Sequence, residues 1–171
     1  MYGLRLNLVK ELLFISAYRN DIYMNPKDVE ILLVEDSLAD AEMTIRALRK
    51  VNLANNLVHL QDGRDALDFL FGEGTFSGRE LSKMPKVILL DIKMPKVDGI
   101  SVLRKIKTDQ LTRMIPVVMM TSSNAEKDVI ASYSLGVNSY VVKPVDFEGF
   151  ASAVKDLGLY WVRTNYTKDL Q

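Results

Sequence analysis

The stretch Val87-Ile88-Leu89-Leu90-Asp91 places four consecutive apolar residues directly before a carboxylate. Such a run predicts a β-strand that is buried on both faces, as in a parallel sheet. Met94-Pro95 and Asp98-Gly99 follow it, so the strand is expected to end at Asp91. In open α/β sheets, ligands bind just beyond the carboxyl ends of the strands, which is where Asp91 falls. Asp91 is therefore the first candidate for a functional residue.

The composition of the 171 residues is that of one ordinary globular domain. Apolar residues make up 48%, and the 22 Lys and Arg residues balance the 22 Asp and Glu residues. This balance gives no electrostatic reason to expect nucleic acid or an anionic membrane as a partner. The absence of Cys excludes disulfides, thiolate metal sites and a cysteine nucleophile. The apolar runs are too short to cross a bilayer, and we expect a cytoplasmic protein.

Predicted strands alternate with predicted helices along the chain. The strands are expected at residues 29–34, 57–60, 87–91, 115–120 and 137–142, and the helices at 39–50, 63–71, 99–107, 126–135 and 147–161. This alternation predicts a doubly wound α/β fold, a five-stranded parallel sheet with right-handed crossovers and helices on both faces. Ser37 or Asp40 is expected to cap the first helix. Residues 72–85 are interpreted as a long exposed loop.

The fold is expected to form a single domain over residues 29–160. Residues 1–28 are interpreted as an N-terminal extension of uncertain status, with Met24 as an alternative start of the chain. Residues 161–171 are interpreted as a C-terminal tail.

The carboxyl ends of all strands in a parallel sheet lie along one edge. Four predicted strands send polar residues to this edge, namely Glu35, Asp36, Asp91, Thr121 and Lys143. Three carboxylates at close range repel by about 1 to 4 kcal/mol per pair, which protonation, Lys143 or a bound cation would relieve. An all-oxygen site without His or Cys suits Mg²⁺ best. Asp91 is then placed to attack phosphorus, with Lys143 and the Thr121 hydroxyl stabilising the phosphoryl oxygens.

Four segments of the chain resemble the receiver domain of two-component response regulators. They are residues 33–37 (LVEDS), 89–99 (LLDIKMPKVDG), 116–122 (PVVMMTS) and 140–144 (YVVKP). The resemblance covers about residues 29 to 160 and implies a flavodoxin-like fold with strand order 2-1-3-4-5. It also implies that Asp91 accepts a phosphoryl group from the phosphohistidine of a sensor histidine kinase.

The resemblance further implies roles for the residues around Asp91. Asp36 and Asp91 would bind Mg²⁺ together with the backbone carbonyl of Lys93, and Glu35 would act in the outer shell of the metal. Thr121 and Lys143 would contact the phosphoryl oxygens, and the Lys143–Pro144 bond would be cis. Tyr140 matches the aromatic residue that switches conformation on phosphorylation, although packing in the core is a close alternative for it.

A looser resemblance points to the small stand-alone regulators that serve cyanobacterial phytochromes and related sensor kinases. It rests on Asp62-Gly63, the long loop 72–85 and Tyr160-Trp161. Only one helix and a tail follow Lys143, too little for a helix-turn-helix, so output is expected through protein contacts. Leu159, Tyr160 and Trp161 would support a homodimer or simply cover the sheet. His59 is expected to be structural and away from the site, and the effect of the Lys93 side chain on phosphoryl lifetime stays open.

Three other functions fit the residues of this chain less well. An aspartate-dependent phosphatase needs a second Asp two residues after the nucleophile, where this chain has Lys93. A flavodoxin-type FMN-binding protein needs a phosphate loop rich in Ser, Thr and Gly after the first strand, where this chain has Glu35-Asp36. A receiver fold kept only as a binding scaffold is disfavoured because Asp36, Asp91, Thr121 and Lys143 are all present.

Overall fold

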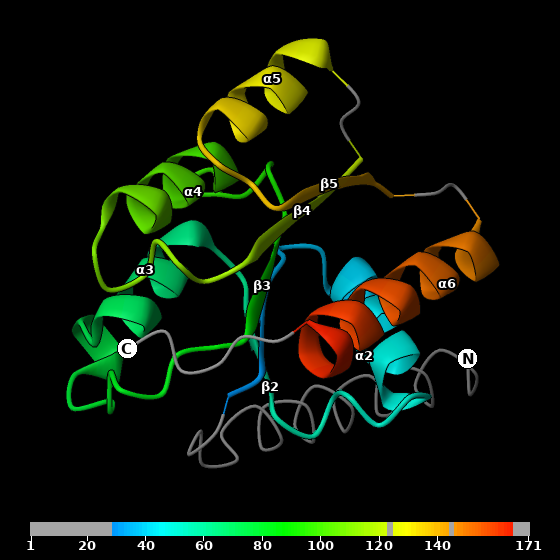
Figure 1. Ribbon diagram of the computed structural model, residues 1–171, viewed down its shortest axis with the longest axis horizontal. Coiled ribbons are helices and arrows are strands. Elements are labelled where there is room, and N and C mark those ends of the chain that lie inside the picture. Colours follow the sequence, from blue (N-terminus) through cyan, green and yellow to red (C-terminus); the bar gives the residue numbers. More distant parts are fainter. Residues whose placement is uncertain (1–28, 123–124, 144–145, 166–171) are drawn as a thin grey trace, which may run out of the picture.

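The computed structural model describes residues 29–122, 125–143 and 146–165. Its centre is one parallel sheet with the strand order β2-β1-β3-β4-β5 (Figure 1). The strands are β1 Ile31–Val34, β2 Leu57–Leu60, β3 Val87–Leu90, β4 Val117–Thr121 and β5 Ser139–Val142. The predicted doubly wound fold and strand order are confirmed. The predictions for residues 1–28 lie outside the described residues.

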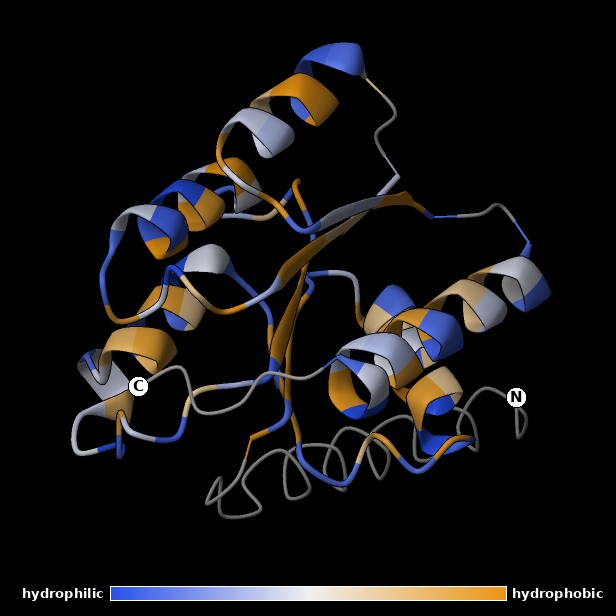
Figure 2. Ribbon diagram, viewed as in Figure 1, coloured by the Kyte–Doolittle hydropathy of each residue, from blue (hydrophilic) through white to orange (hydrophobic). Residues whose placement is uncertain are grey.

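The central strand β3 is buried along its whole length, as the apolar run predicted. Val87 and Leu89 face one side of the sheet and belong to one core, whereas Ile88 and Leu90 face the other side and belong to a second core. Figure 2 shows the central strands in the colours of hydrophobic residues, whereas each helix carries both hydrophilic and hydrophobic colours. A strand that has apolar side chains on both faces is shielded from water only when helices cover both sides of the sheet.

Helices cover the two faces of the sheet in two groups. On one face α2, Leu38–Arg49, and α6, Phe147–Gly158, pack side by side, and on the other lie α3, Gly63–Phe71, and α4, Gly99–Thr108 (Figure 1). Helix α5, Glu126–Ser134, lies beside α4 near the edge strand β5. Both apolar faces of the sheet are therefore covered by helices.

Polar side chains fix where the helices begin. Ser37 caps α2 by accepting the backbone N–H of Asp40 at 3.3 Å. Of the two expected caps, Ser37 and Asp40, the structure therefore shows Ser37 in this role. Asp62 caps α3 and Asp98 caps α4 in the same manner. Gly136, with φ +87°, follows α5 in the left-handed conformation that ends helices. The starts of all five helices and the ends of the first four therefore agree with the predicted bounds within one residue, whereas the end of the last helix does not.

The loop predicted over residues 72–85 is mostly exposed, but part of it packs onto α3. It contains a short 3-10 helix, Gly74–Phe76, and the Phe76 ring meets the Phe69 ring edge-on with centroids 5.3 Å apart. The Arg79 guanidinium lies 4.1 Å from the centre of the Phe69 ring. A cation stacked on an aromatic face is favourable when partly shielded from water. This packing was not predicted from the sequence, because it depends on how the loop that follows α3 folds back onto the helix.

The last helix extends further than predicted. A π-helical segment, Leu159–Thr164, continues α6 beyond Trp161. Leu159 and Trp161 pack against the core shared by α2 and α6, whereas Tyr160 is 51% exposed. The sequence left two roles open for these residues, support of a homodimer and covering of the sheet. Leu159 and Trp161 have the second role in this structure. Among the described helices, none has the length and apolar character needed to cross a bilayer.

Candidate functional site

Three carboxylates meet at the carboxyl ends of β1 and β3. Val34 and Leu90 are register partners in this parallel pair, so Glu35 and Asp91 emerge side by side. One oxygen from each of Glu35, Asp36 and Asp91 lies within 4.8 Å of the others. Glu35 and Asp91 are buried, whereas Asp36 is exposed. The structure thus brings together the three carboxylates that the sequence placed at one edge.

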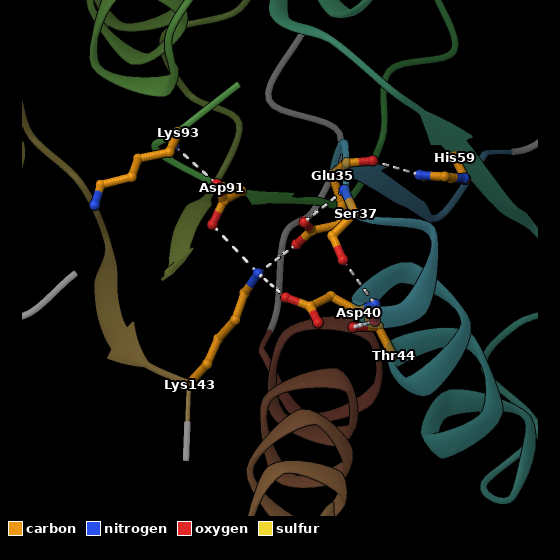
Figure 3. Close-up of polar contacts among 8 residues, drawn as sticks. All are labelled: Glu35, Ser37, Asp40, Thr44, His59, Asp91, Lys93 and Lys143. Atoms are coloured by element: carbon orange, nitrogen blue, oxygen red, sulfur yellow. Dashed lines mark hydrogen bonds and ion pairs between the residues drawn. The ribbon is translucent and has the colours of Figure 1, made fainter. Parts of the chain in front are cut away.

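The ammonium group of Lys143, which follows β5, lies among the carboxylates (Figure 3). Lys143 Nζ is 2.6 Å from Glu35 Oε2 and 3.3 Å from Asp91 Oδ1. A third partner, Asp40 Oδ2 in the first turn of α2, lies at 2.8 Å. Because only 10% of the Lys143 side chain is exposed, these ion pairs are poorly screened by solvent. Lys143 is therefore placed to neutralise charge that develops on Asp91 or on a group attached to it.

The Asp91 side chain is held through both of its oxygens. Oδ2 accepts the backbone N–H of Lys93 at 2.8 Å, and Oδ1 faces Lys143. The backbone N–H of Asp91 donates to the Val34 carbonyl at 3.0 Å, which ties the residue to β1. The Lys93 side chain is exposed and extends away from Asp91 in Figure 3. Asp91 is thus fixed by the backbone around it, and the ammonium of Lys93 is not aimed at it.

Thr121 and Tyr140 lie on the two strands next to this site. Thr121 ends β4, is fully buried, and its backbone carbonyl accepts the N–H of Lys143 at 2.8 Å. Tyr140 lies on β5, pairs in register with Met119, and packs half-buried against the core on the α4 face. The predicted switch role of Tyr140 stays a prediction, and the packing expected as its alternative is present in this conformation.

Burial sets the electrostatics of the site. Burial raises the pKa of Glu35 to about 7, although the hydrogen bond from Lys143 acts in the opposite direction. Burial also raises the pKa of Asp91, while Lys143 and the N–H of Lys93 counteract it. Burial opposes the charge of Lys143, but hydrogen bonds to Asp40 and Glu35 outweigh this effect, so the pKa of Lys143 is raised. The carboxylates exceed the single ammonium in charge, which favours a bound cation.

The loop after β3 is packed tightly against its neighbours. Lys96 has a positive φ of 63°, and its Nζ lies 2.5 Å from Oδ2 of Asp62, the residue that caps α3. Gly63 lies so close to this loop that a Cβ added there would be 2.1 Å from the Val97 carbonyl oxygen. The loop that carries Lys93 is therefore anchored to the start of α3 by an ion pair and by close backbone contact.

We expect Gly99→Ala to destabilise the protein by about 2 kcal/mol or more. Alanine would ordinarily stabilise a helical position by about 1 kcal/mol relative to glycine. Here the added Cβ would lie 2.0 Å from the Asp91 carbonyl oxygen and 2.9 Å from the Ile92 Cα, so the backbone that carries Asp91 must move. Denaturant unfolding monitored by circular dichroism measures the change.

Gly149→Ala is the matched control, because Gly149 also lies in the first turn of a helix. The atoms nearest its added Cβ, at 2.9 Å, belong to the exposed Asp146 side chain, which can shift by a few tenths of an ångström while it still accepts the Gly149 N–H. We expect this control to change the free energy of unfolding by less than about 1 kcal/mol. A Gly99→Ala variant as stable as this control would contradict the close packing at Asp91.

Two residues near the site were not predicted by the sequence. The sequence indicates Asp40 only as a possible helix cap, whereas the structure shows it as an ion-pair partner of Lys143. His59 was expected to be structural and away from the site; it is buried, but its Nε2 lies 2.8 Å from the Glu35 carbonyl oxygen. Burial lowers the pKa of His59, so a neutral ring donates this hydrogen bond. The available signal for Asp40 was its place in the first turn of the helix that follows the acidic pair at the end of the first strand, which brings it close to the same edge of the sheet.

The predicted cis bond between Lys143 and Pro144 lies outside the described residues, because Pro144 is not among them.

The donor set of the site is suited to a hard divalent cation. Glu35, Asp36 and Asp91 offer carboxylate oxygens within 4.8 Å of one another, and hard cations prefer oxygen ligands. This cluster is the one group of three or more potential metal ligands found in the part of the chain that the structure describes. A buried carboxylate, a cluster of potential cation ligands and an ammonium group at one place are the groups that phosphoryl transfer to a carboxylate requires.

Residues 31–155 match the response regulator receiver domain. The chain therefore belongs to this family, whose members accept phosphoryl groups in two-component signal transduction. A sensor histidine kinase is the partner that this family implies, and receiver domains bind a divalent metal ion.

Several members of the family are similar to this chain over most of their length. Response regulator Rcp1 of Synechocystis sp. is 41% identical over 140 residues, which cover 82% of this chain and 92% of Rcp1. The crystal structure of the Mn²⁺-bound form of Rcp1 matches with a TM-score of 0.75, 38% identity, and coverage of 81% and 97%. The phosphorylated cyanobacterial phytochrome response regulator RcpA matches with a TM-score of 0.75, 34% identity and the same coverage. The probable methanogenesis regulatory protein FilR2 of Methanothrix harundinacea is 42% identical over 136 residues, covering 79% of this chain and 84% of FilR2.

Proposed function

We propose that Asp91 is the residue that accepts the phosphoryl group from a sensor histidine kinase. The observation that carries this proposal is the position of the Asp91 carboxylate, 3.3 Å from the Lys143 ammonium and within 4.8 Å of the Glu35 and Asp36 carboxylates. An Asp91 oxygen attacks phosphorus, the bond between phosphorus and the kinase histidine nitrogen breaks, and the electron pair of that bond stays on the histidine. Asp91 then carries an acyl phosphate.

The surrounding residues have separate roles in this transfer. Asp36, Asp91 and the backbone carbonyl of Lys93 would hold Mg²⁺, with Glu35 in its outer shell, and their oxygen donors fit a hard cation. When bound, Mg²⁺ supplies positive charge that offsets the repulsion between the carboxylates and the phosphoryl oxygens. Lys143 donates a charge-assisted hydrogen bond to a phosphoryl oxygen. The same charge stabilisation serves hydrolysis of the acyl phosphate, by which the domain would return to its unphosphorylated state.

Thr121 and Tyr140 would transmit the change to the surface. Phosphorylation adds nearly two negative charges close to the end of β4. The Thr121 hydroxyl would move toward a phosphoryl oxygen, and Tyr140 would turn into the space that it leaves. Tyr140 lies on the edge strand β5, so its movement would alter the surface formed with α5 and α6.

The proposed partner is a phytochrome-type sensor kinase, with output through protein contacts rather than binding to nucleic acid or membrane. RcpA is a phytochrome response regulator, and its structure matches 81% of this chain. The exposed Tyr160 in the π-helical segment that follows α6 supports a homodimer contact as part of the same proposal. Light scattering with and without a phosphodonor tests for the dimer.

Incubation with a small phosphodonor such as acetyl phosphate tests the central proposal. Intact-mass measurement should find one added phosphoryl group in the presence of Mg²⁺ and none after chelation of the metal. Absence of any Mg²⁺-dependent labelling would favour a receiver fold kept as a binding scaffold.

We expect Mg²⁺ binding at pH 7 to release protons. With a pKa of about 7, Glu35 is protonated in about half of the metal-free molecules at this pH. A cation beside Glu35 favours its charged form, so binding expels this proton. The release should decrease as the pH rises from 6 to 8, because metal-free Glu35 loses its proton over that range. Calorimetric titrations in two buffers with different ionisation enthalpies measure the release.

Glu35→Gln is the control for this experiment, because it keeps the shape of the side chain without a titrating proton. Its heats of Mg²⁺ binding should be the same in both buffers after correction for dilution. Proton release of the same size in Glu35→Gln would show that another group is responsible.

A further inference from the structure

Asp40 belongs to the charged cluster but has no part in the proposed phosphoryl transfer. Its Oδ2 lies 2.8 Å from Lys143 Nζ, as close as a strong charge-assisted hydrogen bond. The carboxylates that come within 4.8 Å of one another as potential metal ligands are those of Glu35, Asp36 and Asp91, so Asp40 stands outside that group. A carboxylate that binds the neutralising lysine without serving the metal requires its own explanation.

The start of α2 directs the Asp40 side chain toward Lys143. Asp40 is the third residue of the helix, after the cap Ser37, where an acidic side chain often turns back to accept the N–H of the cap residue. Here the Ser37 N–H donates instead to Glu35 Oε1 at 3.2 Å. Ser37 Oγ still accepts the N–H of Asp40, which fixes the backbone of Asp40. The Asp40 carboxylate is therefore left to pair with Lys143 (Figure 3).

Asp40 competes with Asp91 for the ammonium group. Lys143 has three N–H donors and three carboxylate partners, at 2.6 Å for Glu35, 2.8 Å for Asp40 and 3.3 Å for Asp91. The phosphoryl acceptor is thus the most distant of the three. Figure 3 shows Asp40 and Asp91 on opposite sides of the ammonium, so a movement toward one is a movement away from the other.

We propose that Asp40 is a positioning residue that restrains Lys143 on the α2 side of the site and thereby weakens its hold on the phosphorylated Asp91. This inference rests on the proposed function of Asp91 and Lys143. In the unphosphorylated protein the ammonium stays with Glu35 and Asp40. A phosphoryl group on Asp91 must draw the ammonium away from Asp40, and the ion pair lost in this movement lowers the stability of the phosphorylated state.

Beryllofluoride, a mimic of the phosphoryl group on an aspartate, tests the inference in the presence of saturating Mg²⁺. Asp40→Asn keeps the size of the side chain and removes its charge, so Lys143 is released for the mimic. We expect Asp40→Asn to bind beryllofluoride about threefold to tenfold more tightly than the wild type. Asp40→Ser, which suits the first turn of a helix and also lacks the charge, should shift the affinity in the same direction. Calorimetry or fluorine NMR measures the affinity.

Glu42→Gln is the matched control. It removes one negative charge from the same helix, but Glu42 pairs with Arg46 rather than with Lys143. We expect Glu42→Gln to bind beryllofluoride within about twofold of the wild type, because the Glu42 carboxylate is paired with the Arg46 guanidinium and does not restrain Lys143. An equal gain in affinity for Glu42→Gln would overturn the inference, since the effect would then come from net charge alone.

A second comparison uses Lys143→Met as the background. Without the ammonium, Asp40 has nothing to restrain, so adding Asp40→Asn should leave the affinity for beryllofluoride within about twofold. A gain that persists in this background overturns the inference, as does unchanged or weaker binding by Asp40→Asn in the wild-type background. Failure of the wild-type protein to bind beryllofluoride with Mg²⁺ would instead overturn the proposed function of Asp91, and the inference with it.

Discussion

Asp91→Asn should take up no phosphoryl group under conditions in which the wild-type protein is labelled. The asparagine amide has no carboxylate oxygen to attack phosphorus, so the acyl phosphate cannot form. The loss should not come from unfolding. Burial raises the pKa of Asp91, which means that its charge is disfavoured in the folded protein. A neutral side chain of the same size should therefore leave the free energy of unfolding unchanged or higher.

The measurement is intact mass after incubation with acetyl phosphate and Mg²⁺, together with denaturant unfolding of both proteins. Asp156→Asn is the control. It makes the same chemical change as Asp91→Asn, but at an exposed residue of α6 away from the site. We expect this control to label like the wild type. Labelling of Asp91→Asn at the wild-type level would show that another residue is the acceptor.

Lys143→Met should destabilise the metal-free protein by about 3 kcal/mol at pH 8. Removal of the ammonium leaves the Glu35 and Asp91 carboxylates, 4% and 7% exposed, without their cation. Breaking a buried ion pair from one side is costly because the remaining charge is neither solvated nor paired. The loss should be largest when both carboxylates are ionised.

The pH dependence of this loss follows from the sign of the pKa shifts. The pKa of Glu35 is already about 7 with Lys143 present, and loss of the ammonium raises it further. As the pH falls from 8 to 5, Glu35 takes up a proton in the folded variant before it does so in the unfolded chain. The folded variant therefore gains stability over this range, and the difference from the wild type becomes smaller. Added Mg²⁺ should reduce the difference as well, because it supplies the missing positive charge.

Lys86→Met is the control for this prediction. Lys86 also forms an ion pair, 2.6 Å from Glu30 Oε1, but 45% of its side chain is exposed. Exposed pairs contribute little, so we expect a change of less than about 1 kcal/mol. Urea unfolding at pH 8 and pH 5 with both variants gives the comparison. Equal losses for Lys86→Met and Lys143→Met would contradict the idea that burial gives Lys143 its importance.

Most of the fold could be predicted from the sequence because the signals are local. The apolar run Val87-Ile88-Leu89-Leu90 fills both cores by alternation, and the caps at Ser37, Asp62 and Asp98 define where helices begin. The extension of the last helix beyond Trp161 was missed, since a single apolar residue, Val162, followed by polar residues is too short a pattern to indicate continued helix. The packing of Arg79 on Phe69 was missed for a different reason, because it depends on how a loop folds back onto α3.

The sequence by itself determined which residues reach the carboxyl ends of the strands, because a strand that ends in Asp91 or Lys143 must deliver that side chain to the edge of a parallel sheet. Only the tertiary structure decided how these side chains pair. Lys143 and Asp40 are 103 residues apart, and their contact depends on the seating of α2 against the sheet. The contact of His59 with Glu35 depends in the same way on the pairing of β2 with β1. Distances of a few tenths of an ångström decide which carboxylate holds the ammonium, and packing of helices on the sheet sets those distances.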